Sequence, residues 1–400
     1  MAIKPLEKCP VCNSDKLVDH ISIINAPVFC NVFLNTETEA LNAPKGDIQL
    51  ASCSNCKHVF NRTFDASLLD YSGDYDCSLH YSGSFQAYAK TLSEDLINRH
   101  EIFNKTIVEI ACGKGDFLSS LCKLGDNKGI GFDPSYEEGR LDEELTQNIT
   151  FIRDYYSDKY SHLEADLLCC RHALEHIETP TEFLKTIWGA IGERSESSNN
   201  NCILFFEMPS VLYIIKEMGV WDIIYEHCGY FCKNSLSKAF QLSGFMPQKL
   251  DNVYGNQYLT IEAIPSSLSE INAEPISADD EQVEQYLAAF PKQYDDKVTA
   301  WKARLESAKN NNERVVVWGA GSKGVTFLNI LGVTDEVGFI VDLNPHKQGK
   351  FVPGTGHKVV SPEFLREYQP TMVIVMNPVY TEEIKQSLLD MNITAQVIEG

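Results

Sequence analysis

The residues best suited to acid–base chemistry lie in the middle of the chain. Glu226 and His227 stand side by side, directly after Tyr225, in an otherwise apolar stretch. A histidine takes up a proton near neutral pH, and a neighbouring carboxylate can orient its ring and stabilise its charged form. We therefore predict that His227 removes a proton from a substrate and that Glu226 orients it. The alternative is a core histidine with satisfied hydrogen bonds.

Two further histidines, His172 and His176, follow the apolar stretch 165–170. In open α/β sheets ligands bind outside the carboxyl ends of the strands, so these histidines are predicted to face the reacting region. Together with Tyr225, they are candidates to hydrogen-bond an oxygen on which negative charge develops. For one of them, capping of the next helix is the alternative.

A glycine-rich turn predicts a nucleoside-binding site. Residues 107–118 have the pattern of a buried strand, a turn and the start of a helix, and a second strand further on ends in an acid. Glycine lets the backbone approach a ligand closely, and the acid can accept hydrogen bonds from ribose hydroxyls. A third strand over 148–152 places one more acid to accept from an adenine amino group, with helix capping as the alternative. The predicted cofactor-binding residues are Glu109, Ala111, Gly113, Gly115, Asp133 and Asp154.

The residue types in this turn favour one cofactor. An acid on the first strand, followed by a small residue, Cys112, Gly113 and Gly115, resembles the turn of S-adenosylmethionine methyltransferases more than the G-x-G-x-x-G of nicotinamide enzymes. Ala111 stands where the methyltransferase pattern usually has glycine, and alanine suits a turn that needs no positive φ there. We therefore expect S-adenosylmethionine as the cofactor.

Four cysteines form two C-x-x-C knuckles, Cys9 with Cys12 and Cys53 with Cys56. Each knuckle can point two thiolates at one tetrahedral centre, and four thiolates suit zinc. The long segment between the knuckles is expected to form a small β layer. Four protein ligands leave no open position on the metal, so the predicted zinc is structural. A redox pair or unrelated core thiols are the alternatives.

A second glycine turn, Gly319 to Gly324, follows an apolar strand, and Asp342 closes the next strand. Taken literally, its G-x-G-x-x-G pattern predicts NAD binding. Only about 85 residues remain from the start of that strand, which is short for a complete dinucleotide-binding sheet. A half-Rossmann unit can instead hold one phosphate group at its helix N-terminus, assisted by a lysine. The predicted substrate contacts of this region, including the basic loop 345–356, are Ser322, Lys323, His346 and Lys347.

The stretch 70–81 is rich in tyrosine, glycine and serine. A loop of this kind can form the wall of a polar pocket or connect two domains. We include Tyr75 and Tyr81 among the predicted substrate contacts.

The composition limits the classes of partner. A net charge of −22 argues against a nucleic-acid backbone, and it requires local basic residues or backbone amides at any phosphate site. Thirteen cysteines, an odd number, fit a reducing cytoplasm. No signal-like N-terminus is present and no apolar run approaches the ~18 residues of a membrane span, so we expect a cytoplasmic protein without a membrane partner. A monomer or weak homodimer is expected.

The order of motifs predicts three domains. A zinc-binding, β-rich domain is expected over 1–80, and an α/β domain of alternating strands and helices over 81–265. A linker near 264–280 then leads to a long helical pattern up to Asn310, which Pro291 is expected to break or kink. Residues 266–400 as a whole are expected to form a smaller, Rossmann-like α/β domain.

These three blocks, in this order, resemble the three-domain sugar C-methyltransferases, which make branched deoxysugars from nucleotide-linked ketosugars. The resemblance covers nearly the whole chain. It rests on the paired knuckles, the turn after Glu109, the Glu226-His227 pair followed by Tyr230-Phe231, and the C-terminal glycine turn with its loop 345–349. It implies a structural zinc domain, a central seven-stranded class I sheet for S-adenosylmethionine, and a C-terminal domain that closes over the sugar nucleotide without binding NAD.

The resemblance also implies which residues act. The catalytic segment of the family usually has the sequence Tyr-His-Glu-His, and here Ile224 and Tyr225 occupy the first two positions. His176 aligns with another active-site histidine of the family. The predicted function is methylation of a nucleotide-linked (deoxy)sugar, with His227 as general base in C-methylation of a ketosugar, although the same base would serve O-methylation. The alternatives are a methyltransferase for another natural-product or glycan intermediate, and a nicotinamide-binding protein that uses the Gly319–Gly324 turn.

Overall fold

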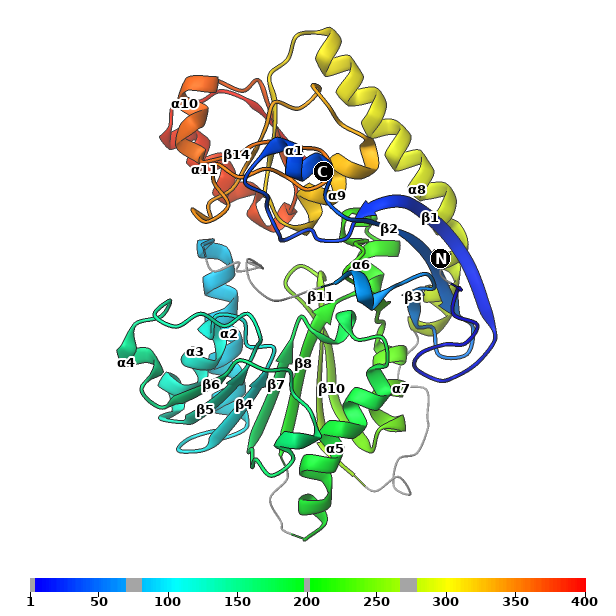
Figure 1. Ribbon diagram of the computed structural model, residues 1–400, viewed down its shortest axis with the longest axis vertical. Helices are drawn as coiled ribbons and strands as arrows, with labels where there is room; N and C mark the ends of the chain where they lie inside the picture. Colours follow the sequence, from blue (N-terminus) through cyan, green and yellow to red (C-terminus); the bar gives the residue numbers. More distant parts are fainter. Residues whose placement is uncertain (1–3, 70–80, 198–201, 267–278) are drawn as a thin grey trace.

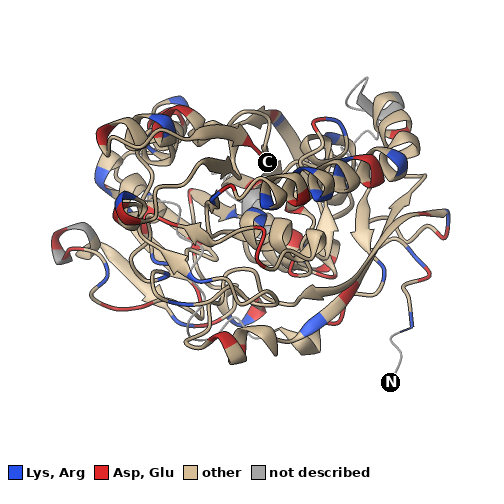
Figure 2. Cartoon of the chain, turned by 90° about the horizontal axis from the view of Figure 1, so that it is seen from above, with Lys and Arg blue, Asp and Glu red and all other residues tan. Residues whose placement is uncertain are grey.

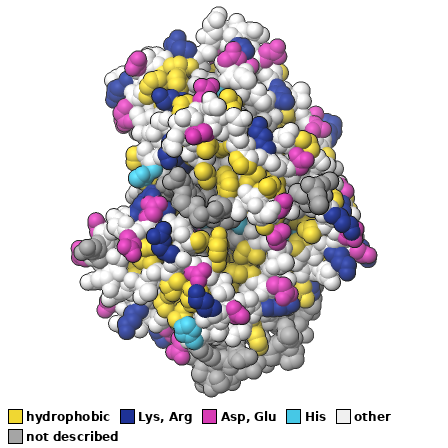
Figure 3. Space-filling view, in the orientation of Figure 1, with side chains coloured by type: hydrophobic (Ala, Val, Ile, Leu, Met, Phe, Trp, Pro, Cys, Tyr) yellow, Lys and Arg dark blue, Asp and Glu magenta, His cyan; other side chains and the backbone are white. Residues whose placement is uncertain are grey.

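The chain folds around three β-sheets of four, seven and five strands. The computed structural model describes residues 4–69, 81–197, 202–266 and 279–400. In Figure 1 the seven-stranded sheet forms the lower half and the C-terminal domain the upper half, while the N-terminal strands lie at one side, next to helix α8. Figure 3 shows hydrophobic side chains gathered on this face between the two halves.

The seven-stranded sheet has the order β10-β11-β8-β7-β4-β5-β6. β11 runs antiparallel to both of its neighbours, while β8, β7, β4, β5 and β6 run parallel to one another. This arrangement confirms the predicted fold class of the central domain. Its strands are β4 (Thr106–Ile110), β5 (Lys128–Phe132), β6 (Ile149–Ile152), β7 (Leu167–Arg171), β8 (Ile203–Pro209), β10 (Phe245–Val253) and β11 (Tyr258–Pro265).

Both faces of this sheet are covered by helices, because successive residues of a strand point to opposite faces. Ile107 and Leu167 pack with α2 and α3 in one hydrophobic cluster. Their neighbours Val108 and Leu168 pack with α5 and α7 in another, which also contains three of the four knuckle cysteines. The helices and single turns of this domain are α2 (Gly83–Arg99), α3 (Asp116–Gly125), α4 (Glu143–Thr146), α5 (Pro180–Ser197), α6 (Val211–Ile215), α7 (Lys233–Leu242), η2 (Asp158–Tyr160), η3 (Leu174–His176) and η4 (Val220–Asp222).

The N-terminal sheet takes one strand from far along the chain. β9 pairs with β3 through Val59–Tyr230 and Phe60–Gly229, so a piece of the central domain completes the order β1-β2-β3-β9. The sequence did not reveal this pairing, because two residues carry no strand pattern of their own. The elements are β1 (Leu17–Pro27), α1 (Glu37–Leu41), β2 (Lys45–Cys53), β3 (Val59–Asn61), η1 (Ala66–Leu68) and β9 (Gly229–Tyr230).

The C-terminal domain is a five-stranded parallel sheet in the order β14-β13-β12-β15-β16, as expected for a smaller Rossmann-like unit. Helix α8 precedes it. The elements are α8 (Asp279–Asn310), β12 (Val315–Trp318), α9 (Ser322–Leu331), β13 (Phe339–Val341), β14 (Val359–Val360), η5 (Pro362–Phe364), α10 (Leu365–Tyr368), β15 (Met372–Val375), η6 (Pro378–Tyr380), α11 (Thr381–Asp390) and β16 (Gln396–Glu399).

Helix α8 continues through Pro291, so the expected break is wrong. Pro291 removes one helical hydrogen bond. The buried side chains of Phe290 and Tyr294 on either side of it belong to a core that α8 shares with β1, α9 and the segment 211–232. Burial of these aromatic rings offsets the lost bond and keeps the helix in one piece.

The charged residues do not segregate strongly. Figure 2 shows Lys and Arg interspersed with Asp and Glu along the helices, so the net charge of −22 is spread over the molecule. Among the described helices, none combines the length and the apolar character that crossing a membrane requires.

Candidate active site

The predicted glycine turn lies at the carboxyl end of β4, where it leads into α3. Ala111, Gly113 and Gly115 all have positive φ, at 56°, 56° and 90°. The expectation that Ala111 needs no positive φ is therefore wrong: the turn alternates left-handed residues, and alanine occupies one of these positions. At Gly113 a Cβ would meet nothing within 4 Å, so there is open space above the backbone where a ligand can approach.

Two carboxylates flank this turn. Asp133 follows β5, and its carboxylate accepts hydrogen bonds from the Gly113 amide (2.8 Å) and the Ser135 amide (2.7 Å). Glu109 on β4 is buried, and its Oε2 has no hydrogen-bond partner within the described part of the chain. Burial raises the pKa of Glu109 to about 8. A buried carboxyl oxygen without a partner is a group that a hydroxyl-bearing or cationic ligand could satisfy.

Asp154 stands after β6, as predicted, but it already has partners. Its carboxylate accepts from Lys159 Nζ (2.7 Å) and the Tyr160 hydroxyl (2.7 Å), and these bonds lower the pKa of Asp154 to about 2. An adenine amino group would have to share this carboxylate with them.

His227 is the centre of a second group at the carboxyl edge of the sheet. Its side chain is buried, and it lies edge-to-face against His176 with ring centroids 4.9 Å apart. One ring nitrogen donates to the backbone carbonyl of Asp222, and Nδ1 has no hydrogen-bond partner among the described residues. Burial, followed by the nearby His176 and His172, lowers the pKa of His227 well below its ordinary value. The ring is therefore neutral at pH 7, with Nδ1 as a proton acceptor.

The predicted partners of His227 are arranged differently from expectation. Glu226 Oε2 accepts from the Cys30 amide at 2.8 Å, and the Asp222 carbonyl takes the orienting role expected of Glu226. The Tyr225 hydroxyl accepts from the Asp65 amide at 3.0 Å, and the ring lies against Gly46 and Phe64 in the N-terminal sheet. Tyr225 thus has its contacts in the N-terminal region, and its predicted place at the reacting oxygen stays a prediction.

His172 and His176 lie beyond the end of β7, and His172 is next to the buried Glu207 of β8. His172 Nε2 is 2.9 Å from Glu207 Oε1, which also accepts from Arg171 Nη2 at 2.7 Å. The hydroxyl of Tyr88 donates to the other oxygen of Glu207. Although burial acts in the opposite direction, Arg171 and His172 lower the pKa of Glu207 to about 2. This network fixes an anion at the edge of the sheet and holds His172 beside it.

Three of the six predicted substrate contacts, Tyr81, Lys323 and Lys347, have side-chain bonds to other residues of the protein. Lys323 Nζ binds both carboxylate oxygens of Asp222 at 2.6 and 2.7 Å. Lys347 is buried and donates to the Ala320 carbonyl at 2.8 Å, so it supports the turn and does not face a phosphate as expected. Tyr81 accepts from Arg140, Ser322 begins α9 and His346 is exposed, while Tyr75 lies outside the described residues.

The four knuckle cysteines converge on one point. Their sulfur atoms all lie within 4.8 Å of one another, with Cys9–Cys56 at 3.5 Å and Cys12–Cys53 at 3.6 Å. Tetrahedral thiolates bound to zinc at about 2.3 Å are separated by about 3.8 Å. The cluster is compatible with zinc, and its sulfur atoms lie on the core of the central domain.

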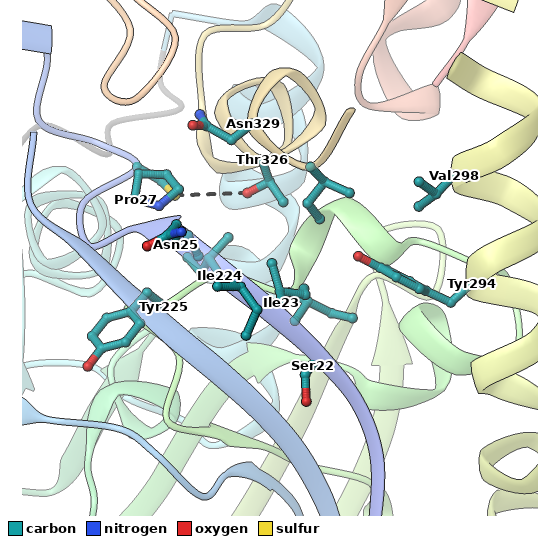
Figure 4. Close-up of a pocket in the computed structure, with 15 residues that line it drawn as sticks. Ser22, Ile23, Asn25, Pro27, Ile224, Tyr225, Tyr294, Val298, Thr326 and Asn329 are labelled. Atoms are coloured by element: carbon teal, nitrogen blue, oxygen red, sulfur yellow. Dashed lines mark hydrogen bonds between the residues drawn. The ribbon is translucent and has the colours of Figure 1, made fainter. Parts of the chain in front are cut away.

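A cavity of about 200 Å³ lies elsewhere, between β1, α8 and α9 (Figure 4). Its lining comes from these elements and residues 223–225, with the Cys30 thiol 3.9 Å from Thr326 Oγ1. The ring of Tyr225 is directed away from Thr326 and Asn329 in this view. The cavity takes no residue from the seven-stranded sheet and is separate from the histidines.

Comparison with known proteins agrees with this geometry. The methyltransferase domain family matches residues 85–250, and the C-methyltransferase C-terminal domain family matches residues 260–395. The chain is 21% identical over 397 residues to the C-methyltransferase NovU of Streptomyces niveus. The alignment covers 96% of this chain and 92% of NovU. The chain belongs to the multi-domain, S-adenosylmethionine-dependent C-methyltransferases.

Solved structures similar to this methyltransferase include other methyltransferases. Magnesium protoporphyrin IX methyltransferase from Synechocystis PCC 6803 is 16% identical, with a TM-score of 0.35. The superposition covers 48% of this chain and 90% of that protein. The 1,6-didemethyltoxoflavin-N1-methyltransferase of Burkholderia thailandensis is 10% identical, with a TM-score of 0.35. Here the superposition covers 53% of this chain and 97% of that protein.

Sequence reasoning missed two features of this methyltransferase. Glu175 lies beside His176 in the sequence and was assigned no role, yet its carboxyl group joins His176 and His227 within 4.8 Å. The Asp222 carbonyl, which holds the ring of His227, is a backbone group and leaves no signal in the residue types. Glu175 is an acidic residue directly before a histidine, and both follow the buried strand β7. This pattern in the sequence could have identified Glu175.

Proposed function

We propose that this methyltransferase places a methyl group on the carbon next to the ketone of a nucleotide-linked sugar, with His227 as general base. The observation that carries the proposal is Nδ1 of His227, which is buried and without a hydrogen-bond partner among the described residues, on a ring whose pKa is lowered by burial. It lies at the sheet edge that carries the glycine turn. Similarity to the C-methyltransferase NovU along nearly the full chain supports carbon as the methylated atom.

The cofactor site is formed by the turn after β4 and the acid after β5. Glu109, Ala111, Gly113, Gly115 and Asp133 would hold S-adenosylmethionine, which supplies an electrophilic methyl group when it is bound. The open space above Gly113 and the unpartnered Oε2 of Glu109 fit such a ligand. Holding two reactants in line supplies a large share of the rate of a displacement reaction.

The chain's own residues carry the proton step. The Asp222 carbonyl fixes the ring proton of His227 on one nitrogen, which leaves the Nδ1 lone pair free to take a proton from the acceptor carbon. The electron pair of that C–H bond remains on the acceptor and forms the bond to the methyl carbon. His172 and His176 lie close enough to His227 to lower its pKa, and they would face the oxygen on which negative charge develops.

We propose that the cluster of Cys9, Cys12, Cys53 and Cys56 holds a structural zinc ion. All four positions of a tetrahedral metal would be filled by thiolates, so the metal would have no open position for a substrate. Its role would be to fix the two knuckles, and through β2 and β3 the strand β9 that directly follows the base.

The proposal is tested by His227→Asn. We expect kcat to fall by roughly 10²- to 10⁴-fold, because a positioned general base contributes about that factor. Affinity for S-adenosylhomocysteine, measured by calorimetry, should stay within a few fold of the wild-type value. Turnover is assayed with S-adenosylmethionine and a panel of nucleotide-linked ketosugars, and mass spectrometry of the product shows whether carbon or oxygen is methylated.

His20→Asn is the matched control, because His20 lies in β1 and pairs with Ser52. It should keep full turnover. Retained turnover in His227→Asn excludes His227 as the base. Methylation of an oxygen, or binding of NAD without binding of S-adenosylhomocysteine, overturns the proposed reaction.

A further inference from the structure

Glu175 is a buried carboxyl group that the mechanism above does not use. It lies in η3, its side chain is almost fully buried, and its Oε2 has no hydrogen-bond partner within the part of the chain that the structure describes. One carboxylate oxygen of Glu175 and one ring nitrogen each of His176 and His227 lie within 4.8 Å of one another. Such an unsatisfied buried group in a native protein calls for a reason, and a catalytic role is one of the few known.

His227 needs a carboxylate to act as a strong base. Burial strongly disfavours its charged form, so an imidazolium alone would be unstable at this position. Glu226, its sequence neighbour, already accepts from the Cys30 amide. Glu175 instead brings one carboxylate oxygen within 4.8 Å of a ring nitrogen of His227. Both side chains also carry a buried atom without a hydrogen-bond partner in the described structure, Oε2 of Glu175 and Nδ1 of His227.

We propose that Glu175 accepts, through His227, the proton that leaves the methyl acceptor. This inference rests on the proposed role of His227 as base. The acceptor C–H bond breaks, its proton passes to the imidazole of His227 and then to the carboxylate of Glu175, and its electron pair forms the C–CH₃ bond while the S–CH₃ bond breaks. Glu175 starts as a carboxylate and ends as a carboxylic acid, so no buried cation persists after the step.

The surroundings of Glu175 set the pH dependence. The ionisable neighbours of Glu175 come from β7, β8 and the residues that follow β7. His172 Nδ1 lies 3.8 Å from Glu175 Oε1, while Glu207 of β8 and Cys170 of β7 interact with the carboxyl group electrostatically. The Cys228 thiol donates to the backbone carbonyl of Glu175 at 3.3 Å. Burial, with a smaller contribution from Glu207, raises the pKa of Glu175 to about 8. The carboxylate that can accept a proton therefore becomes more populated as the pH rises through about 8.

The first test requires no methyl acceptor. Imidazole ¹⁵N signals of the full chain are recorded with S-adenosylhomocysteine between about pH 6 and pH 9. His227 should stay neutral, and its Nδ1 signal should shift with a midpoint near pH 8 as Glu175 ionises. Glu175→Gln should abolish that step. Glu178→Gln, which removes an exposed carboxyl group three residues away, should retain it. A wild-type protein without the step, or a step that survives in Glu175→Gln, overturns the inference.

The second test measures turnover with the ketosugar nucleotide that the panel selects. Wild-type kcat/KM should rise with pH to a plateau above about pH 8, and Glu175→Gln should lower kcat by about 10- to 100-fold and remove that rise. Glu175→Asp should restore part of the rate. If His227→Asn is inactive while Glu175→Gln keeps the wild-type pH profile, only this inference fails. If His227→Asn keeps its turnover, the proposed base fails as well.

A metal ion is the competing occupant of this cluster, since two histidines and one carboxylate are common metal ligands. Elemental analysis of the full chain distinguishes it. At most one zinc per chain, unchanged in Glu175→Gln, supports the proton-acceptor role. A second metal ion per chain that is lost in Glu175→Gln overturns it, because the metal would occupy Nδ1 of His227.

Discussion

Ala111 shows how a single backbone angle limits the cofactor turn. Its φ of 56° lies in the left-handed region, where an L-residue other than glycine costs roughly 1–2 kcal/mol. Gly113 and Gly115 adopt positive φ in the same turn without that cost. The turn thus stores a small strain at the position where the backbone is proposed to meet the cofactor.

We expect Ala111→Gly to stabilise the protein by about 0.5–1 kcal/mol, because glycine removes the strain but adds entropy to the unfolded chain. Denaturant unfolding monitored by circular dichroism measures the change. Ala87→Gly is the control, because Ala87 is exposed inside α2, and there glycine should destabilise by about 1 kcal/mol. Equal destabilisation by both substitutions would contradict the left-handed strain at Ala111.

At the level of elements, the position of His227 depends on two contacts of the segment 220–232. β9 extends the N-terminal sheet at one end of this segment, and η4 packs on α9 of the C-terminal domain at the other. The Asp222 side chain binds Lys323 of α9, while the Asp222 carbonyl holds the ring of His227. The C-terminal glycine turn therefore supports His227, the proposed base, through an ion pair at the start of its helix.

Lys323→Met is expected to destabilise the protein by about 1–3 kcal/mol, since it leaves the mostly buried Asp222 carboxylate without its cation. The double variant Lys323→Met with Asp222→Asn should be less destabilised than the sum of the two single variants, because the two residues form one pair. Thermal and urea unfolding of the four proteins measure this coupling. Additive effects, together with weaker nucleotide binding in Lys323→Met alone, would favour the original expectation of a phosphate contact.

At the level of the whole molecule, the three sheets meet around the segment that carries His227. One hydrophobic cluster joins residues of β1, η4, α8, α9 and the C-terminal sheet. A second joins Cys9, Cys53 and Cys56 to the core of the central sheet. The N-terminal domain therefore contacts the segment of His227 and the core of the central domain through packing as well as through β9.

Loss of the proposed zinc ion should affect turnover more than cofactor binding. Chelation, or Cys53→Ser, should lower the melting temperature and reduce kcat at least 10-fold by releasing β3 and β9. Binding of S-adenosylhomocysteine should be retained at temperatures below the transition. Cys122→Ser is the control, because its buried thiol in α3 is distant in sequence from the knuckles and belongs to another core. Full turnover in a metal-free protein would contradict this role.

The features predicted correctly from the sequence are those that depend on neighbouring residues. The strand-turn-helix after Glu109, the alternating strands of the central domain and the paired knuckles each have a local pattern in period or spacing. The predicted histidines also lie at the carboxyl edge of the sheet, because a residue after a buried parallel strand has nowhere else to lie.

By itself, the sequence determined the fold class, the methyltransferase family and the segment that carries His227, the proposed base. The tertiary structure decided the partners of His227. Glu226 and His227 are adjacent in a non-helical segment, so their side chains point in different directions, toward Cys30 and toward η3. Which carboxyl group reaches His227 depends on how η3, η4 and β9 pack together, and contacts between elements far apart in the chain leave no pattern in either segment.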